Sequence, residues 1–128
     1  ADRKQAAESI GIRFVVRVES TGLGFIEPVD VTTLFGNLLE NAMQAVLKCC
    51  GERCIKVHIR NYNEMLSIRI ENSVEKEVRI KNGKPVSTGG RGTGIGCLNV
   101  ERCVEKYGGS VLYKNDGGKF YSDVILNR

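Results

Sequence analysis

Residues 31–50, VTTLFGNLLENAMQAVLKCC, predict one long helix of about five turns that no proline interrupts. Asp30, directly before them, is the expected N-cap. The apolar residues of this stretch recur at steps of four and share one face: Leu34, Leu38, Ala42 and Val46. We expect that face to be buried, with the helix anchoring the fold.

A second feature of this helix is the pair Asn37 and Asn41, one turn apart beside the apolar face, with Gln44 three residues further on. Asparagine is a poor choice for helix stability because its side chain competes for the backbone. The plain alternative is a solvated helix face. The leucine and alanine neighbours favour a cleft, where an amide oxygen can complete a magnesium shell of waters and nucleotide phosphates.

The rest of the chain predicts strands around two helices. Residues 12–19 resemble a strand, residues 54–62 and 65–72 a hairpin, and residues 110–126 a second hairpin. Glu71 and Asn72 end one strand with polar side chains that can hydrogen-bond a ligand. Residues 73–93 lack periodicity and predict a long loop, the kind that often serves as a lid. These elements together predict a two-layer α/β sandwich.

The glycine stretch GGRGTGIG, residues 89–96, precedes a predicted helix that ends at Gly108 and Gly109. Its spacing fails the Walker phosphate loop, the dinucleotide fingerprint and the protein-kinase glycine loop. What remains is either a nest of backbone N–H groups for an anion at a helix start, or a flexible linker. The asparagines of the long helix favour the anion, and phosphate is the obvious one.

Composition limits the other function classes. The 128 residues predict one domain, and 19 basic against 15 acidic residues give a net charge of +4 without a charged block. The absence of Trp and of basic–aromatic clusters argues against nucleic-acid binding. No apolar run reaches the roughly 20 residues that cross a bilayer. Five cysteines, an odd count, predict reduced thiols, and Cys50, Cys54 and His58 lack the tight spacing of a zinc site.

Three motifs follow one another along the chain: NLLENA at 37–42, ENSV at 71–74 and GRGTGIG at 90–96. Over residues 11–127 this order resembles the GHKL superfamily of ATP-binding domains, which includes DNA gyrase B, Hsp90-type chaperones, MutL and sensor histidine kinases. The ending YGGSVLYKNDGGKFYSDVIL, residues 107–126, is most similar to the catalytic domain of histidine kinases. Within these it is closest to the peptide-sensing, quorum-sensing type related to AgrC.

The resemblance implies an α+β fold, the two-layer Bergerat sandwich, with a mixed and mostly antiparallel sheet and helices on one face. It implies a GHKL domain over residues 11–128, with residues 1–10 as the end of an upstream dimerisation-helix linker. The implied cofactors are ATP and Mg²⁺, with Asn41 as the metal ligand, Asn37 in the same phosphate pocket and Asn72 at the adenine. The residues implied to surround and charge the phosphate site are Arg91, Gly92, Thr93, Gly94, Ile95 and Gly96.

Departures from the family pattern sharpen these expectations. Asn37 replaces the glutamate that activates water in hydrolysing members, which favours phosphoryl transfer. Asn72 replaces an aspartate and lacks the following glycines, which predicts weaker adenine binding. Gln44 stands where a basic residue is common, so Arg91 or Lys84 would supply the charge. His58 is the only histidine and lies mid-strand, where a structural role is expected.

The implied protein is therefore a histidine kinase whose catalytic domain binds Mg-ATP but does not phosphorylate itself. Its partners would be a histidine-bearing dimerisation domain and a response regulator, with no nucleic acid and no direct membrane contact. The domain would be cytoplasmic, in a protein of the bacterial cell membrane. Residues 73–93 are expected to be mobile without nucleotide. The alternatives are a GHKL ATPase, a degenerate binding module and a serine kinase of the anti-sigma type.

Overall fold

The computed structural model describes residues 11–19, 24–85 and 93–127, with side chains in the last range from residue 98 onward. Residues 1–10, where the upstream helix is predicted, lie outside this part of the chain. The elements follow one another in this order: β1 (Arg13–Glu19), α2 (Pro28–Leu47), β2 (Cys54–Tyr62), β3 (Met65–Ser73), β4 (Ile80–Lys81), β5 (Lys84–Pro85), α3 (Thr93–Lys106), β6 (Ser110–Asp116) and β7 (Lys119–Asn127).

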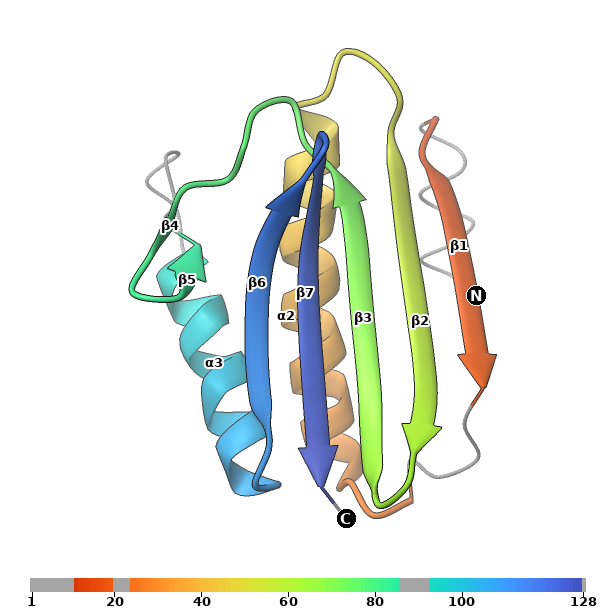
Figure 1. Cartoon of the computed structure of the whole chain (residues 1–128), viewed down its shortest axis with the longest axis vertical. Helices are drawn as coiled ribbons and strands as arrows, with labels where there is room; N and C mark the ends of the chain where they lie inside the picture. The colour runs from red at the N-terminus through yellow and green to blue at the C-terminus, as the bar shows by residue number, and fades with distance from the viewer. Residues whose placement is uncertain (1–10, 20–23, 86–92, 128) are drawn as a thin grey trace.

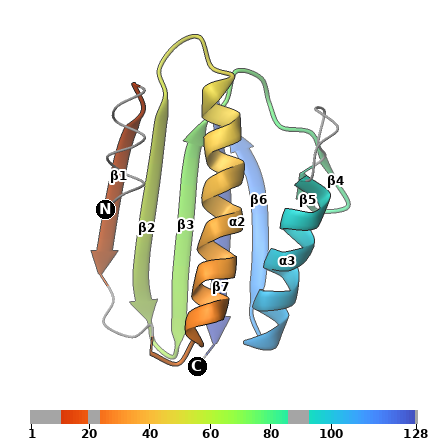
Figure 2. The same cartoon turned by 180° about the vertical axis from the view of Figure 1, so that it is seen from behind.

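Five of the strands form one sheet in the order β1-β2-β3-β7-β6 (Figure 1). β1 and β2 run parallel, and the other neighbours run antiparallel. Figure 2 shows α2 and α3 side by side on one face of this sheet, where they contact each other and the strands. The predicted two-layer α+β sandwich, with helices on one face of a mixed sheet, is confirmed.

The core lies between the two helices and the sheet, and α3 contributes Val100, Cys103 and Val104 to it. The predicted helix face, Leu34, Leu38, Ala42 and Val46, is buried. Every second residue of β3 faces it, and the apolar ones are Leu66, Ile68 and Ile70, none more than 1% exposed. Each such side chain stabilises the fold by about 1.5–3 kcal/mol through burial.

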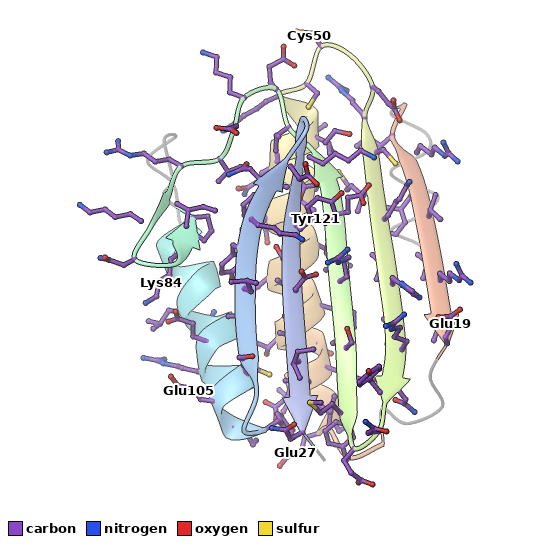
Figure 3. All side chains as sticks on the ribbon, in the orientation of Figure 1. Glu19, Glu27, Cys50, Lys84, Glu105 and Tyr121 are labelled. Atoms are coloured by element: carbon purple, nitrogen blue, oxygen red, sulfur yellow. The ribbon has the colours of Figure 1, made fainter. Side chains whose placement is uncertain are left out.

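The opposite face of the sheet carries charged side chains in cross-strand pairs. Arg69 on β3 binds Asp123 on β7 through two hydrogen bonds of 2.7 and 3.0 Å. Lys119 lies 3.2 Å from Glu71, and Tyr121 stands on this face in Figure 3. Opposite charges across a ladder stabilise a solvated sheet face. Because these charged pairs face solvent, this side of the sheet needs no further layer to cover it.

The start and end of α2 differ from the prediction. The helix begins at Pro28, with Glu27 in the N-cap position, so Asp30 lies in the first turn and is not the N-cap. Proline fits the first helical position because its fixed φ is helical and its missing N–H would be unpaired there. The helix ends at Leu47 and not at residue 50. Just after this end, the Arg53 side chain donates hydrogen bonds to the carbonyls of Leu47 and Cys49.

The predicted long loop of residues 73–93 is wrong in part, because β4 and β5 form a small hairpin within it. Asn82 and Gly83 make its turn with φ values of 55° and 75°, the left-handed conformation that two-residue hairpin turns require. Strands of two residues carry too little periodicity to be recognised in a sequence. Asn115 of β6 also fastens this segment, since its amide exchanges two 2.8 Å hydrogen bonds with the backbone of Val78.

α3 begins at Thr93, so the residues Thr93–Gly96 form its first turn, whereas the sequence placed these glycines before the helix. The helix ends as predicted at the glycine pair, where the Gly109 N–H donates to the carbonyl of Val104 at 2.9 Å. None of the helices in the described ranges is long and apolar enough to span a membrane.

Candidate functional site

The predicted site residues come from three elements on the helix side of the sheet. α2 carries Asn37 and Asn41, and α3 begins with the last residues of the glycine stretch. Asn72 shares the inward face of β3 with Ile70, because strand residues alternate between faces. In Figure 2 the start of α3 lies level with the middle of α2. The fold therefore gathers on one side of the sheet what the sequence spreads over 60 residues.

Asn37 is half-buried, and its amide nitrogen donates a 2.7 Å hydrogen bond to the carbonyl of Thr33 in the preceding turn. This bond to the preceding turn uses one of the two N–H donors of the amide and leaves the amide oxygen as an acceptor. Asn37 can thus offer an acceptor to a ligand, such as the water shell of a cation.

Asn41, one turn later, is also half-buried, and its amide has no hydrogen-bond partner among the described residues. A half-buried amide without a partner is available to a ligand. Glu40, the neighbouring carboxylate, is exposed. Residues next to each other lie about 100° apart around a helix, so Glu40 does not share the direction of Asn41.

Asn72 is 3% exposed, and its amide nitrogen donates to the carbonyl of Ser73 at 3.1 Å. The amide oxygen is left as the acceptor. In the register of the sheet Asn72 lies opposite Phe120, whose ring stacks on that of Tyr113 with centroids 5.9 Å apart. The sequence analysis did not identify these two rings as part of the site. The one signal that could have found them is their alternation with more exposed residues in the last hairpin, which indicates that they face inward. Together they form an aromatic wall beside the Asn72 amide.

Glu71 does not belong to this site, although the sequence grouped it with Asn72. It points to the uncovered face, where Lys119 and Lys56 lie 3.2 and 3.9 Å from its carboxylate. Successive strand residues face opposite sides, which separates the two end residues of this motif.

Of the two basic residues expected near the phosphates, Lys84 and Arg91, the structure describes only Lys84. Lys84 forms a 3.0 Å ion pair with Glu101 of α3, which ties β5 to that helix. Arg91 and Gly92 lie outside the described residues. For Thr93, Gly94, Ile95 and Gly96 the backbone is described, and it forms the N-terminal turn of α3, where free N–H groups and the helix dipole favour an anion.

A polar network that sequence reasoning missed joins the far end of α3 to the first turn of α2. Tyr107 donates a 2.5 Å hydrogen bond to Asp30, and Lys106 lies 2.8 Å from the same carboxylate. The backbone N–H of Glu27 donates to the Tyr107 hydroxyl at 2.9 Å. Lys106 and then Tyr107 lower the pKa of Asp30 below its ordinary value. Burial, followed by Asp30, raises the pKa of Tyr107.

Two other features lie apart from the site. His58 binds Glu19 at 2.8 Å on the sheet, the structural kind of role expected for it. A shallow hollow of about 230 Å³ opens at the end of the sheet beyond β3 and holds none of the predicted site residues. Its lining residues are Cys49, Gly51, Glu52, Ser73, Val74, Glu75, Gly117, Gly118 and Lys119.

Comparison with known proteins adds a family and a fold. A model of the GHKL domain matches residues 26–127. No curated protein matches the sequence. The catalytic domain of the histidine kinase ThkA, in a nucleotide-free form, superposes with a TM-score of 0.77 at 16% identity, over 97% of this chain and 85% of that one.

Two longer proteins share the architecture. The histidine kinase AdeS of Acinetobacter baumannii has a TM-score of 0.70 at 16% identity, over 98% of this chain and 57% of its own. The blue-light activated histidine kinase EL346 of Erythrobacter litoralis has a TM-score of 0.69 at 13% identity, over 96% of this chain and 38% of its own. At these identities the likeness concerns the fold alone.

Proposed function

Since this chain belongs to the GHKL family, whose domains bind ATP, we propose that it is the catalytic domain of a two-component sensor histidine kinase. It would position Mg-ATP for transfer of the γ-phosphoryl group to a histidine on a dimerisation domain outside this chain. The observation that carries the proposal is the amide of Asn41 on α2, which has no partner within the described part of the chain and lies on the same side of the sheet as Asn72 and the start of α3.

The adenine end of the nucleotide is assigned to β3 and the last hairpin. The Asn72 oxygen can accept a hydrogen bond from the adenine amino group, because the amide nitrogen is already bound to Ser73. The buried rings of Phe120 and Tyr113 provide an apolar wall of the kind that small-molecule sites use. A neutral amide accepts more weakly than a carboxylate, so we expect modest affinity.

The phosphate end is assigned to α2 and α3. Asn41 offers an amide oxygen, the ligand type that Mg²⁺ takes alongside waters and phosphates. The N–H groups at the start of α3 face the phosphates, with Arg91 as an added charge. Bound Mg²⁺ would neutralise charge on the phosphates, while these residues orient the γ-phosphoryl group.

Transfer is favoured over hydrolysis because of Asn37. An amide does not accept a proton at neutral pH, and the nitrogen of this one is held by Thr33. The GHKL ATPase remains the second candidate, with the degenerate binding module and the anti-sigma serine kinase behind it. Steady phosphate release by the chain alone would favour the ATPase.

The proposed setting is a cytoplasmic domain of a membrane-bound bacterial kinase of the AgrC-like type, with a response regulator downstream. His58, the one histidine of the chain, is held by Glu19 on the sheet. We therefore expect the isolated chain to bind Mg-ATP without phosphorylating itself.

Calorimetric titration of a non-hydrolysable ATP analogue, with and without Mg²⁺, tests the proposal. Asn41→Ala is expected to lower the Mg²⁺-dependent affinity about tenfold or more, and to leave the Mg²⁺-free affinity little changed. Asn61→Ala makes the same substitution at an exposed position of β2, outside the proposed site, and is the matched control. Equal affinity of the Asn41 variant and the parent in Mg²⁺ would exclude Asn41 as the metal ligand.

A further inference from the structure

The outer edge of β1 is a strand edge to which no strand among the described residues pairs. The Arg13 N–H donates to the carbonyl of Arg53 at 2.9 Å, so its backbone groups point toward β2. Because backbone groups alternate along a strand, those of Phe14, Val16 and Val18 point outward. An edge of this kind is a template for pairing with another chain.

The side chains at this edge are apolar on the helix side of the sheet. Val16 and Val18 are 48% and 54% exposed, high values for residues that alternate with charged ones and follow the buried Phe14. The charged residues of the strand face the other side, with Arg13 at its start and Glu19 at its end. Figure 3 shows Glu19 at the end of β1.

The sequence RFVVRVE complements itself when two copies run antiparallel about Val16. Val16 then lies opposite Val16 of the second copy, and Phe14 lies opposite Val18, so the apolar residues on the helix side of the edge meet, while Val15 on the other face lies opposite Arg17. Arg13 lies opposite Glu19 at both ends, because the twofold axis repeats each contact. The outward backbone groups of Phe14, Val16 and Val18 face their counterparts and can form hydrogen-bonded pairs.

Neighbouring registers are less favourable. Alignment shifted by two residues in one direction places Arg13 opposite Arg17, and in the other direction it places Arg17 opposite itself. Like charges directly opposite each other destabilise a ladder. The charges of β1 therefore select one register in addition to keeping the edge soluble.

We propose that the chain pairs with a second copy of itself through β1, which joins two five-stranded sheets edge to edge about a twofold axis at Val16. β1 and β6 occupy opposite edges of the sheet, and α3 packs beside β6. The pairing thus leaves the start of α3 and the proposed nucleotide site open. It goes beyond the proposed function and needs no nucleotide.

Sedimentation equilibrium of the 128-residue chain tests this pairing, with a reductant present because Cys50 is exposed and free. At about 0.1 mM, a concentration suited to a small interface, the average mass should rise toward twice that of the chain. Val16→Pro should weaken the dimer about tenfold or more, because it removes an outward N–H on each copy. The β1–β2 ladder keeps its own hydrogen bonds, since proline is tolerated where the N–H faces away from the sheet.

A charge exchange tests the register independently of any proline effect. Arg13→Glu and Glu19→Arg should each weaken the dimer, because each places like charges opposite one another at both ends. The double variant should restore association. Lys114→Glu on β6 makes the same charge change as Arg13→Glu at the far edge and should leave the dimer unchanged.

A chain that stays monomeric at this concentration would overturn the proposal. So would a dimer indifferent to Val16→Pro and to the single charge variants, because it would use another surface. Failure of the double variant to recover would overturn the register. None of these results bears on ATP binding, which is measured separately.

Discussion

Asn37 and Asn41 occupy successive turns of one helix, yet the structure holds them differently. The Asn37 amide is bound to its own helix, while the Asn41 amide has no partner among the described residues. The spacing predicted both positions but not this difference, because a back-bond depends on the side-chain rotamer. That both line one site stays a prediction, in which both amides act as acceptors and the metal is assigned to Asn41.

The role of Asn72 can be tested by nucleotide preference. Asn72→Ala should lower the affinity for an ATP analogue about fivefold, the loss of one hydrogen bond. Affinity for inosine triphosphate, which has a carbonyl in place of the amino group, should change little. Ser122→Ala removes another buried polar side chain of the sheet and is the control. Equal losses for both nucleotides would mean that Asn72 acts through the fold and not on the amino group.

Asp30 was expected to cap a helix, and instead it binds Tyr107 and Lys106. Its pKa is lowered in the folded state, so the carboxylate stabilises the fold above its unfolded pKa of about 4. That contribution is lost as the pH falls through the lower, folded value. Asp30→Asn should therefore lower the melting temperature at pH 7, and the deficit should shrink toward pH 3.

Thermal denaturation followed by circular dichroism at both pH values measures this change. Glu105→Gln removes the same charge from an exposed position of α3 and should leave both melting temperatures close to those of the parent. A deficit of the Asp30 variant that is equal at pH 7 and pH 3 would argue against an ionic contribution.

At the scale of elements, the end of α3 is fixed by a close approach of two backbones. A Cβ atom at Gly109 would lie 1.8 Å from the carbonyl oxygen of Ile125 on β7, far inside any contact distance. Helix and sheet meet here without room for a side chain. The glycine pair predicted the end of the helix, but a glycine in the sequence does not indicate which distant backbone packs against it, here that of Ile125.

Gly109→Ala should lower the free energy of unfolding by about 3 kcal/mol, the upper range for overpacking, because β7 cannot move without disturbing the central ladder. Denaturant unfolding measures it. Gly51→Ala is the matched control, since nothing lies within 4 Å of its added Cβ. Similar stability of the two variants would show that the α3–β7 junction relaxes freely.

At the scale of the whole molecule, the fold could be predicted because its layers follow from local periodicity. Steps of four marked the buried face of α2, and alternation marked the strands of both large hairpins. The β4–β5 hairpin was missed because two residues make no period. The Asp30–Tyr107 contact joins residues 77 positions apart and left no local signal, as side-chain pairing between distant elements rarely does.

The hydrogen bond between Tyr107 and Asp30 fixes one end of α3 to the first turn of α2, so α3 can tilt about that end. Its C-terminal end is anchored by Asp30, and its N-terminal end carries the glycine turn. A 14-residue helix is about 21 Å long, so tilting it by about 5° about the anchor moves its first turn by about 2 Å. That displacement is most of a hydrogen-bond length, so a small adjustment of α3 against the core would be enough to make or release contacts with a phosphate.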